Sequence, residues 1–248
     1  MAQPDVDVIV APNPGPMTLE GTNTYLVGRD PAVLIDPGPA DAGHIDAVRA
    51  EAEQRGGIGS VLLTHHHGDH SDGAELLGIE PSELRDGEAE SGLAAVATPG
   101  HTGDHLCFVI APGHPVAPQA SGSICFSGDL ILGSGSTIVP SADQGGSLAD
   151  YMGSLRKLAE LDLELIYPGH GPLIDDPAAK IAEYIEHRES RERRLIAALE
   201  QGERSRLRLL DEVWDDVPAE LRPAAVYAMQ AHLEKLAAEG RLPDGLSE

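Results

Sequence analysis

Short apolar runs bounded by turn residues alternate with amphipathic stretches along the first two thirds of the chain. Segments such as 23–28 (NTYLVG) and 123–132 (SICFSGDLIL) have the length and the β-branched or aromatic content of strands. The stretch 147–161 (SLADYMGSLRKLAEL) repeats apolar residues every three or four positions, as an amphipathic helix does. Because strands and helices alternate, the pattern predicts an α/β fold. The expected strands lie in 6–10, 23–28, 32–38, 60–65, 93–101, 105–111, 123–132 and 163–171, with helices at 40–55, 74–77 and 147–161.

The pattern changes after Gly171. Asp176 and Pro177 form a good N-cap and first-turn pair for a long helix, and two more helices are expected in 205–214 and 218–240. The charge-dense centre of the long helix (EHRESRERR) predicts a solvated face. We therefore predict a catalytic domain in residues 1–175 and a small helical domain in residues 176–248. No flexible Gly/Ser linker separates them, so the second domain is expected to pack against the first.

Composition narrows the range of partners. The 248 residues include 17 basic and 41 acidic side chains, a formal net charge of −24. This charge opposes a broad electrostatic grip on nucleic acid or on an anionic membrane. A local basic strip could still form where RERR (191–194) lies near Arg204, Arg206 and Arg208.

Targeting and redox signals are weak. No apolar run approaches the ~20 residues that a membrane span needs, and the first residues lack the features of a secretory signal. Cys107 and Cys125 both lie in apolar stretches, which is typical of buried thiols in a reducing compartment. We expect a cytoplasmic protein without membrane association.

Candidate metal ligands follow four of the expected strands. The cluster THHHGDH places His65, His67, Asp69 and His70 after the strand at 60–65, and single candidates follow three later strands: His101, Asp129 and His170. Loops at strand ends converge on one rim of a sheet. Side chains two apart in an extended loop face the same way, so the first two histidines can bind one ion while Asp69 and His70 reach toward another.

Imidazole and carboxylate ligands suit zinc best, with Mn²⁺ or Fe²⁺ as alternatives. A polar loop without metal is the competing interpretation of the histidine run, but it leaves the three later candidates unexplained. The remaining histidines are expected to be surface or packing residues, namely His44, His66, His105, His114, His187 and His232.

These motifs resemble those of the metallo-β-lactamase superfamily. THHHGDH matches its T-H-x-H-x-D-H motif, and TPGHT, SGD and YPGHG resemble its later motifs in the right order. Longer segments, including PGPMTLEGTNTYLVG and LIYPGHGPLIDDPAAKIAEYIEHRESRERR, resemble the beta-lactamase-like protein 2 family over most of the chain.

The resemblance implies an αββα sandwich followed by a small winged-helix-like domain. It assigns His65, His67 and His101 to one ion, Asp69, His70 and His170 to a second, and makes Asp129 the bridge. Since Asp129 stands where the best-known β-lactamases of this type have cysteine, hydrolysis of β-lactams is not expected. The segment between His70 and His101 is shorter than the family leads us to expect, and the tail after Gly240 is short for a full wing.

The implied chemistry is hydrolysis by a hydroxide shared between two metal ions, with Asp69 orienting it or passing its proton to the leaving group. A small, anionic ester or thioester is the expected substrate. The alternative is a metal-dependent endoribonuclease acting on single-stranded RNA. A mononuclear iron oxidation enzyme, or a metal-bound module without catalysis, is a third interpretation. The substrate's identity and the oligomeric state stay open.

Overall fold

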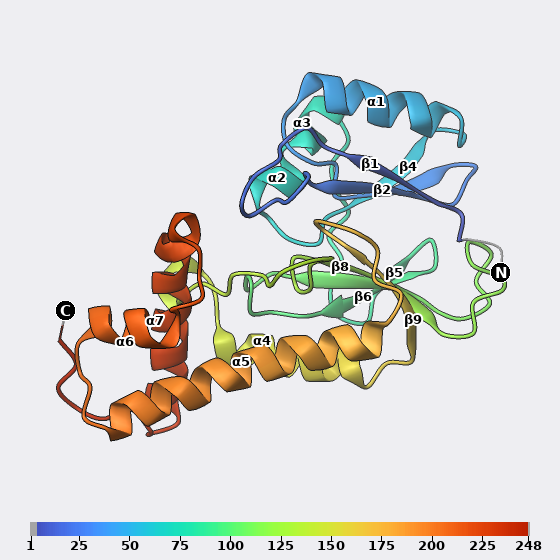
Figure 1. Cartoon of the computed structure of the whole chain (residues 1–248). Coiled ribbons are helices and arrows are strands. Elements are labelled where there is room, and N and C mark those ends of the chain that lie inside the picture. The colour runs from blue at the N-terminus through green and yellow to red at the C-terminus, as the bar shows by residue number, and fades with distance from the viewer. Residues whose placement is uncertain (1–3, 248) are drawn as a thin grey trace.

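Two β-sheets face each other and carry helices on their outer sides. The structure is a computed structural model that describes residues 4–247 (Figure 1). In Figure 1, α1 (Ala42–Glu53) covers one outer face, while α4 (Leu148–Ala159) and α5 (Pro177–Glu200) run side by side along the other. The predicted αββα sandwich is therefore confirmed.

The N-terminal sheet has four strands in the order β1-β2-β3-β4. Its strands are β1 (Val6–Val10), β2 (Asn23–Val27), β3 (Ala32–Ile35) and β4 (Ile58–Leu62). The first three are antiparallel, whereas β3 and β4 are parallel and are connected through α1. Because β3 and β4 run in the same direction, the loops that follow them leave the sheet at one edge.

The second sheet has five strands in the order β5-β6-β7-β8-β9. They are β5 (Ala89–Glu90), β6 (Leu93–Ala97), β7 (Leu106–Ile110), β8 (Ser123–Gly128) and β9 (Leu163–Pro168). Its last two strands are parallel and connected through α4. This second parallel pair brings the loops after β8 and β9 to one edge.

Alternation along the strands divides the sandwich into three apolar layers. On β7, Phe108 and Ile110 enter the core between the sheets, while Cys107 faces the helices. The core between the sheets also includes Tyr25 and Phe126, whose rings pack edge to face with centroids 5.3 Å apart. The two outer layers fill the space under α1 and under α4 and α5.

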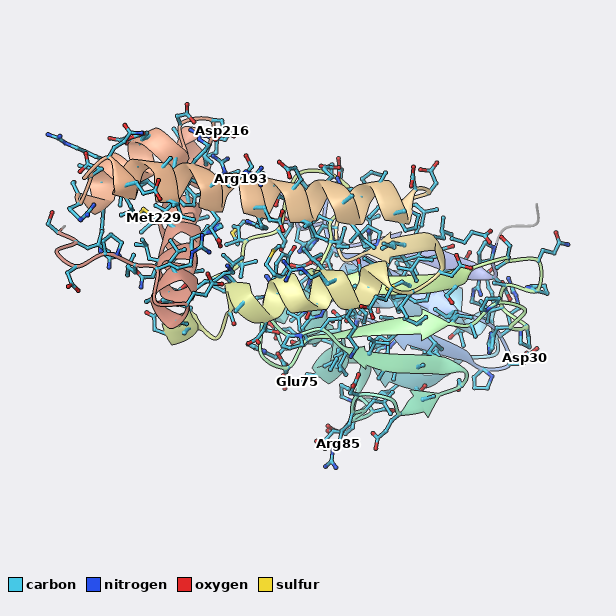
Figure 2. The ribbon with its side chains drawn as sticks, turned by 90° about the horizontal axis from the view of Figure 1, so that it is seen from below. Asp30, Glu75, Arg85, Arg193, Asp216 and Met229 are labelled. Carbon is cyan, nitrogen blue, oxygen red and sulfur yellow. The ribbon has the colours of Figure 1, made fainter. Side chains whose placement is uncertain are left out.

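The C-terminal segment is helical, as predicted. It consists of the second half of α5, α6 (Arg206–Val213), a 3-10 turn (Ala219–Leu221) and α7 (Arg222–Ala238). These helices enclose a core of their own, which includes Leu195, Trp214 and Met229, the last of which is labelled in Figure 2. Among the described residues after Gly240, the tail forms one isolated bridge, between Ser247 and Ser205.

The long helix α5 belongs to both parts of the molecule. Ile181 and Tyr184 at its beginning pack against α4, and Leu195 near its end packs in the C-terminal core. The C-terminal segment thus packs against the sandwich, and the domain boundary at residue 176 stays a prediction. The prediction of a solvated centre was wrong in part, because Arg188 and Arg191 are each only 5% exposed. Arg193, by contrast, lies on the outer side of the helix (Figure 2).

Tyr184 and Arg188 attach α5 to the loop that follows β8. The Tyr184 hydroxyl accepts a hydrogen bond from the Leu132 backbone N–H at 2.9 Å. One turn later, the Arg188 guanidinium donates to the Ser136 hydroxyl and to the Thr137 carbonyl. The C-terminal segment therefore fixes the conformation of residues 132–137.

Short elements account for most of the differences from the expected secondary structure. The two-residue strand β5 and the four-residue helix α2 (Gly68–Ser71) were not predicted. Both are too short for a periodic pattern to be detected. Within residues 4–247, no helix has the length and apolar composition that crossing a membrane requires. Cys107 and Cys125 are buried free thiols.

Replacing Tyr184 with Phe tests the attachment of α5. The substitution leaves the buried Leu132 N–H without its acceptor, so the free energy of unfolding should fall by about 1–3 kcal/mol. Tyr227→Phe on α7 is the matched control, because this side chain is 43% exposed and should change stability by less than about 0.5 kcal/mol. Urea denaturation measures both. Equal stability of Tyr184→Phe and the native protein would show that this hydrogen bond does not hold the loop.

Candidate metal centre

The seven side chains predicted to bind metal converge at the edge of the two sheets. His65 and His67 follow β4, and Asp69 and His70 lie on α2. Loops after β6, β8 and β9 supply the other three: His101, Asp129 and His170. The ligand atoms form two groups, each within 4.8 Å, one of His65, His67, His101 and Asp129 and one of Asp69, His70 and His170.

The three histidines of the first group point ring nitrogens at a common point. Nε2 of His65 and Nε2 of His101 each lie 3.0 Å from Nδ1 of His67. Such an arrangement brings lone pairs together unless a proton or a cation lies between them. An extended backbone at His67 (φ −60°, ψ 138°) presents the ring toward His65, as alternation in an extended loop requires.

Asp129 lies between the two groups. Its Oδ2 is 3.6 Å from His101 Nε2, while its Oδ1 is 3.3 Å from His170 Nε2 and 3.4 Å from His70 Nε2. One carboxylate oxygen therefore faces each group. Asp69 completes the second group, with Oδ2 at 3.4 Å from His170 Nε2.

A buried carboxylate that the sequence analysis did not single out orients two of the histidines. Asp36, at the end of β3, accepts hydrogen bonds from the Thr64 N–H and hydroxyl at 2.8 and 2.7 Å and from His70 Nδ1 at 2.8 Å. Since the Thr64 hydroxyl donates to Asp36, it accepts from His65 Nδ1 at 3.0 Å. These contacts place the Nδ1 proton on both rings and leave both Nε2 atoms facing the centre.

Backbone carbonyls orient the other two Nε2 ligands. His101 Nδ1 donates to the Ile138 carbonyl at 2.8 Å, and His170 Nδ1 donates to the Gly21 carbonyl at 3.2 Å. Ile138 directly follows Thr137, the residue that Arg188 on α5 holds. The C-terminal segment is thus connected to His101 through two adjacent backbone carbonyls.

Two glycines permit the close approach of these loops. A Cβ on Gly169 would lie 2.6 Å from Asp129 Oδ1 and 2.8 Å from His70 Cε1. At Gly100, with φ +139°, a Cβ would lie 2.3 Å from the Tyr151 backbone. A side chain at either position would therefore displace a candidate ligand.

The two groups differ in charge. Burial lowers the pKa of His70, but the carboxylates of Asp129 and Asp36 outweigh it and raise this pKa well above its ordinary value. Burial also lowers the pKa of His170, and contacts with Asp129 and Asp69 raise it to about 9. In the first group, burial and the neighbouring His70 lower the pKa of His65 well below its ordinary value. The second group therefore holds protons beside its carboxylates, and a divalent cation would replace them there.

The donor set fits a pair of divalent ions. Four histidine Nε2 atoms and one Nδ1 are aimed inward by hydrogen bonds or backbone conformation, and the buried Asp129 Oδ1 has no hydrogen-bond partner. Nitrogen-rich ligand sets with carboxylates are typical of zinc, manganese or iron sites. An unpaired buried carboxylate oxygen is costly unless a cation or donor satisfies it.

The other histidines lie outside this set. The His66 side chain is 67% exposed and faces Asp104, as its position in an extended loop predicts. His105 is a packing residue: its ring stacks on that of His65 with centroids 5.3 Å apart. Burial, with the nearby His101 next, lowers the pKa of His105 to about 3, so its ring is neutral.

A cavity of about 610 Å³ opens onto the centre. Five candidate ligands line it, of which Asp69 is the most exposed carboxylate at 30% of its side chain. The opposite wall comes from α5, the 214–221 segment and α7. A substrate can therefore reach the candidate ligands through a space that both parts of the chain enclose.

Sequence profiles match both parts of the chain. A profile of the metallo-beta-lactamase superfamily matches residues 17–78 and 73–170. A profile of the beta-lactamase associated winged helix domain matches residues 208–243. All seven candidate ligands lie within the two segments that the superfamily profile matches.

Relatives extend the similarity along the chain. The beta-lactamase-like protein 2 homolog of Caenorhabditis elegans is 35% identical over 262 residues, which cover 94% of this chain and 84% of that protein. The crystal structure of a metallo-beta-lactamase family protein from Thermus thermophilus has a TM-score of 0.73 at 23% identity, covering 95% and 94% of the two chains. The crystal structure of TTHA1623 in a di-iron-bound form has a TM-score of 0.51 at 22% identity, covering 73% and 96%. These findings show that the chain belongs to the metallo-β-lactamase superfamily of metal-dependent hydrolases and, within it, to the beta-lactamase-like protein 2 family.

Proposed function

We propose that this protein is a dinuclear metal-dependent hydrolase of an ester or thioester. The observation that carries the proposal is the pair of ligand groups with Asp129 between them at one end of a cavity. His65, His67 and His101 would hold one ion, and Asp69, His70 and His170 the other. Zinc is the expected metal for this donor set, and the neighbour described in a di-iron-bound form shows that iron is an alternative within this fold.

Two divalent ions would supply Lewis acidity and lower the pKa of a coordinated water toward about 7. Residues of this chain would keep the two ligand groups together and would hold or transfer the proton. Asp129 would keep the two ligand groups together, with one carboxylate oxygen toward each. Asp69 would hold or transfer a proton at the cavity surface, because its carboxylate is the more exposed of the two.

Cleavage of RNA is the weaker alternative. RNA binding depends on several unpaired cations that contact phosphates. Four of the six arginines considered for a basic strip are instead paired with carboxylates. Arg193 contacts Glu186 and Arg194 contacts Asp215. The pairing extends to Arg191 with Asp216 and to Arg208 with Glu203.

A mononuclear centre leaves the second ligand group without a role, so the oxidation enzyme and the binding module are also disfavoured.

The free, buried cysteines suit a reducing compartment, which supports the proposal of a cytoplasmic protein.

Metal content tests the dinuclear centre. Protein purified without chelator should contain close to two divalent ions per chain by elemental analysis, since each ligand group supplies three or more donors. His170→Ala should lower the content toward one, because it removes a ligand from the second group only. His66→Ala is the matched control and should retain two, since this side chain points away from the centre.

Both variants should keep the native circular dichroism spectrum. One ion per chain in the native protein, with the same content in His170→Ala, would contradict a dinuclear centre.

Substrate preference tests the acyl proposal. The metal-loaded protein should hydrolyse members of a thioester panel and leave unstructured RNA intact at both low and moderate salt. The reason is that most arginines of the expected strip are paired with carboxylates and that the chain carries a formal net charge of −24. His67→Ala should abolish the thioester activity. Metal-dependent RNA cleavage that His67→Ala removes, without turnover of any acyl substrate, would favour the endoribonuclease instead.

A further inference from the structure

The wall of the cavity opposite the candidate metal ligands indicates the size and polarity of the acyl group that the substrate carries. We propose that the C-terminal helices form an acyl-binding wall and that the acyl group is bulky and apolar. The inference rests on the proposed hydrolase function, since it assumes that the scissile bond lies at the metal ligands. It replaces the small, anionic substrate expected from the sequence with a bulky, apolar one.

Both parts of the chain line the space in front of the ligands. From the sandwich come Met17 and Leu19 of the loop after β1 and Ile138 of the loop after β8. The C-terminal segment supplies the facing side chains, among them Trp214, Val217, Leu221, Ala225 and Ala228. A molecule bound at the candidate ligands therefore has apolar side chains on both sides.

The charged residues of the cavity offer little to an anionic acyl group. Arg188 donates to the Thr137 carbonyl and the Ser136 hydroxyl. Arg191 donates to the Val213 carbonyl and is paired with Asp216 at 2.6 Å. Asp216 thus neutralises Arg191, the loop after β8 engages Nη2 of Arg188 but leaves its Nε without a partner, and Glu183 adds negative charge to the same wall.

The size of the cavity argues against a minimal acyl group. A volume of about 610 Å³ lies within the range of sites that enclose ligands of drug size. An acetyl group would leave most of the apolar wall in contact with water. Each fully buried methylene should raise kcat/KM by about fourfold. A decanoyl thioester that buries about four or more of its additional methylenes should therefore exceed the acetyl thioester by at least about 100-fold.

Acyl-chain length tests the inference in the holoenzyme. The values of kcat/KM are measured for acetyl, hexanoyl and decanoyl thioesters of one thiol. Ala228→Phe fills the wall and should reduce the advantage of decanoyl over acetyl by at least about 10-fold. The matched control is Val226→Phe on the same helix, because Val226 is 43% exposed and does not line the cavity. Equal kcat/KM for acetyl and decanoyl thioesters would overturn the proposal.

Trp214 provides a second measurement that does not depend on turnover. It is the single tryptophan of the chain, and it lines the cavity. Decanoate should change its fluorescence in a saturable way, with a half-saturation concentration at least about 100-fold below that of acetate. Ala228→Phe should weaken the decanoate response, whereas Val226→Phe should not.

The two measurements separate the two proposals. A saturable decanoate response without hydrolysis of any thioester would contradict the hydrolase function and leave the acyl-binding wall standing. Thioester hydrolysis without a saturable decanoate response, or with a response that Ala228→Phe leaves unchanged, would overturn the acyl-binding wall.

Discussion

The buried carboxylate of Asp36 is the interaction on which the metal centre depends. It lies at the end of β3, 2% exposed, and a carboxylate in such a place is stable only when hydrogen bonds satisfy it. Asp36 obtains those bonds from Thr64 and His70, and Thr64 in turn accepts from His65. The need to satisfy one charge therefore fixes two rings, one in each ligand group, with their Nε2 atoms facing inward.

The sheets and the C-terminal segment complete this arrangement. Two parallel strand pairs, β3 with β4 and β8 with β9, deliver the loops that carry Asp36, the histidine cluster, Asp129 and His170 to one edge. The helix α5 then holds the loop after β8 through Tyr184 and Arg188, next to the carbonyl that orients His101. The C-terminal helices thus have two roles in one place: they support a ligand loop and form the far wall of the cavity.

The sequence predicted the features of the structure that depend on local residue patterns. Apolar runs and helical spacing indicated an α/β fold and the three C-terminal helices, and the resemblance to the metallo-β-lactamase superfamily implied the sandwich. His, Asp and Gly at strand ends indicated the candidate ligands. Asp36 stood at a strand end as well, but the bonds it receives come from residues 28 and 34 positions away, which periodicity does not show. Arg188 and Arg191 were expected in solvent because their segment is densely charged. Backbone carbonyls of distant loops, invisible in a sequence, allow them to be buried.

The central claim is that the seven side chains hold two ions with Asp129 between them. A crystal structure of the zinc-loaded protein, with anomalous data collected on both sides of the zinc absorption edge, measures this directly. Two anomalous peaks should appear roughly 3.5–4 Å apart, one within about 2.0–2.1 Å of nitrogen atoms of His65, His67 and His101 and the other similarly close to those of His70 and His170. A single peak, or a second peak that none of Asp69, His70 and His170 contacts, would contradict the account.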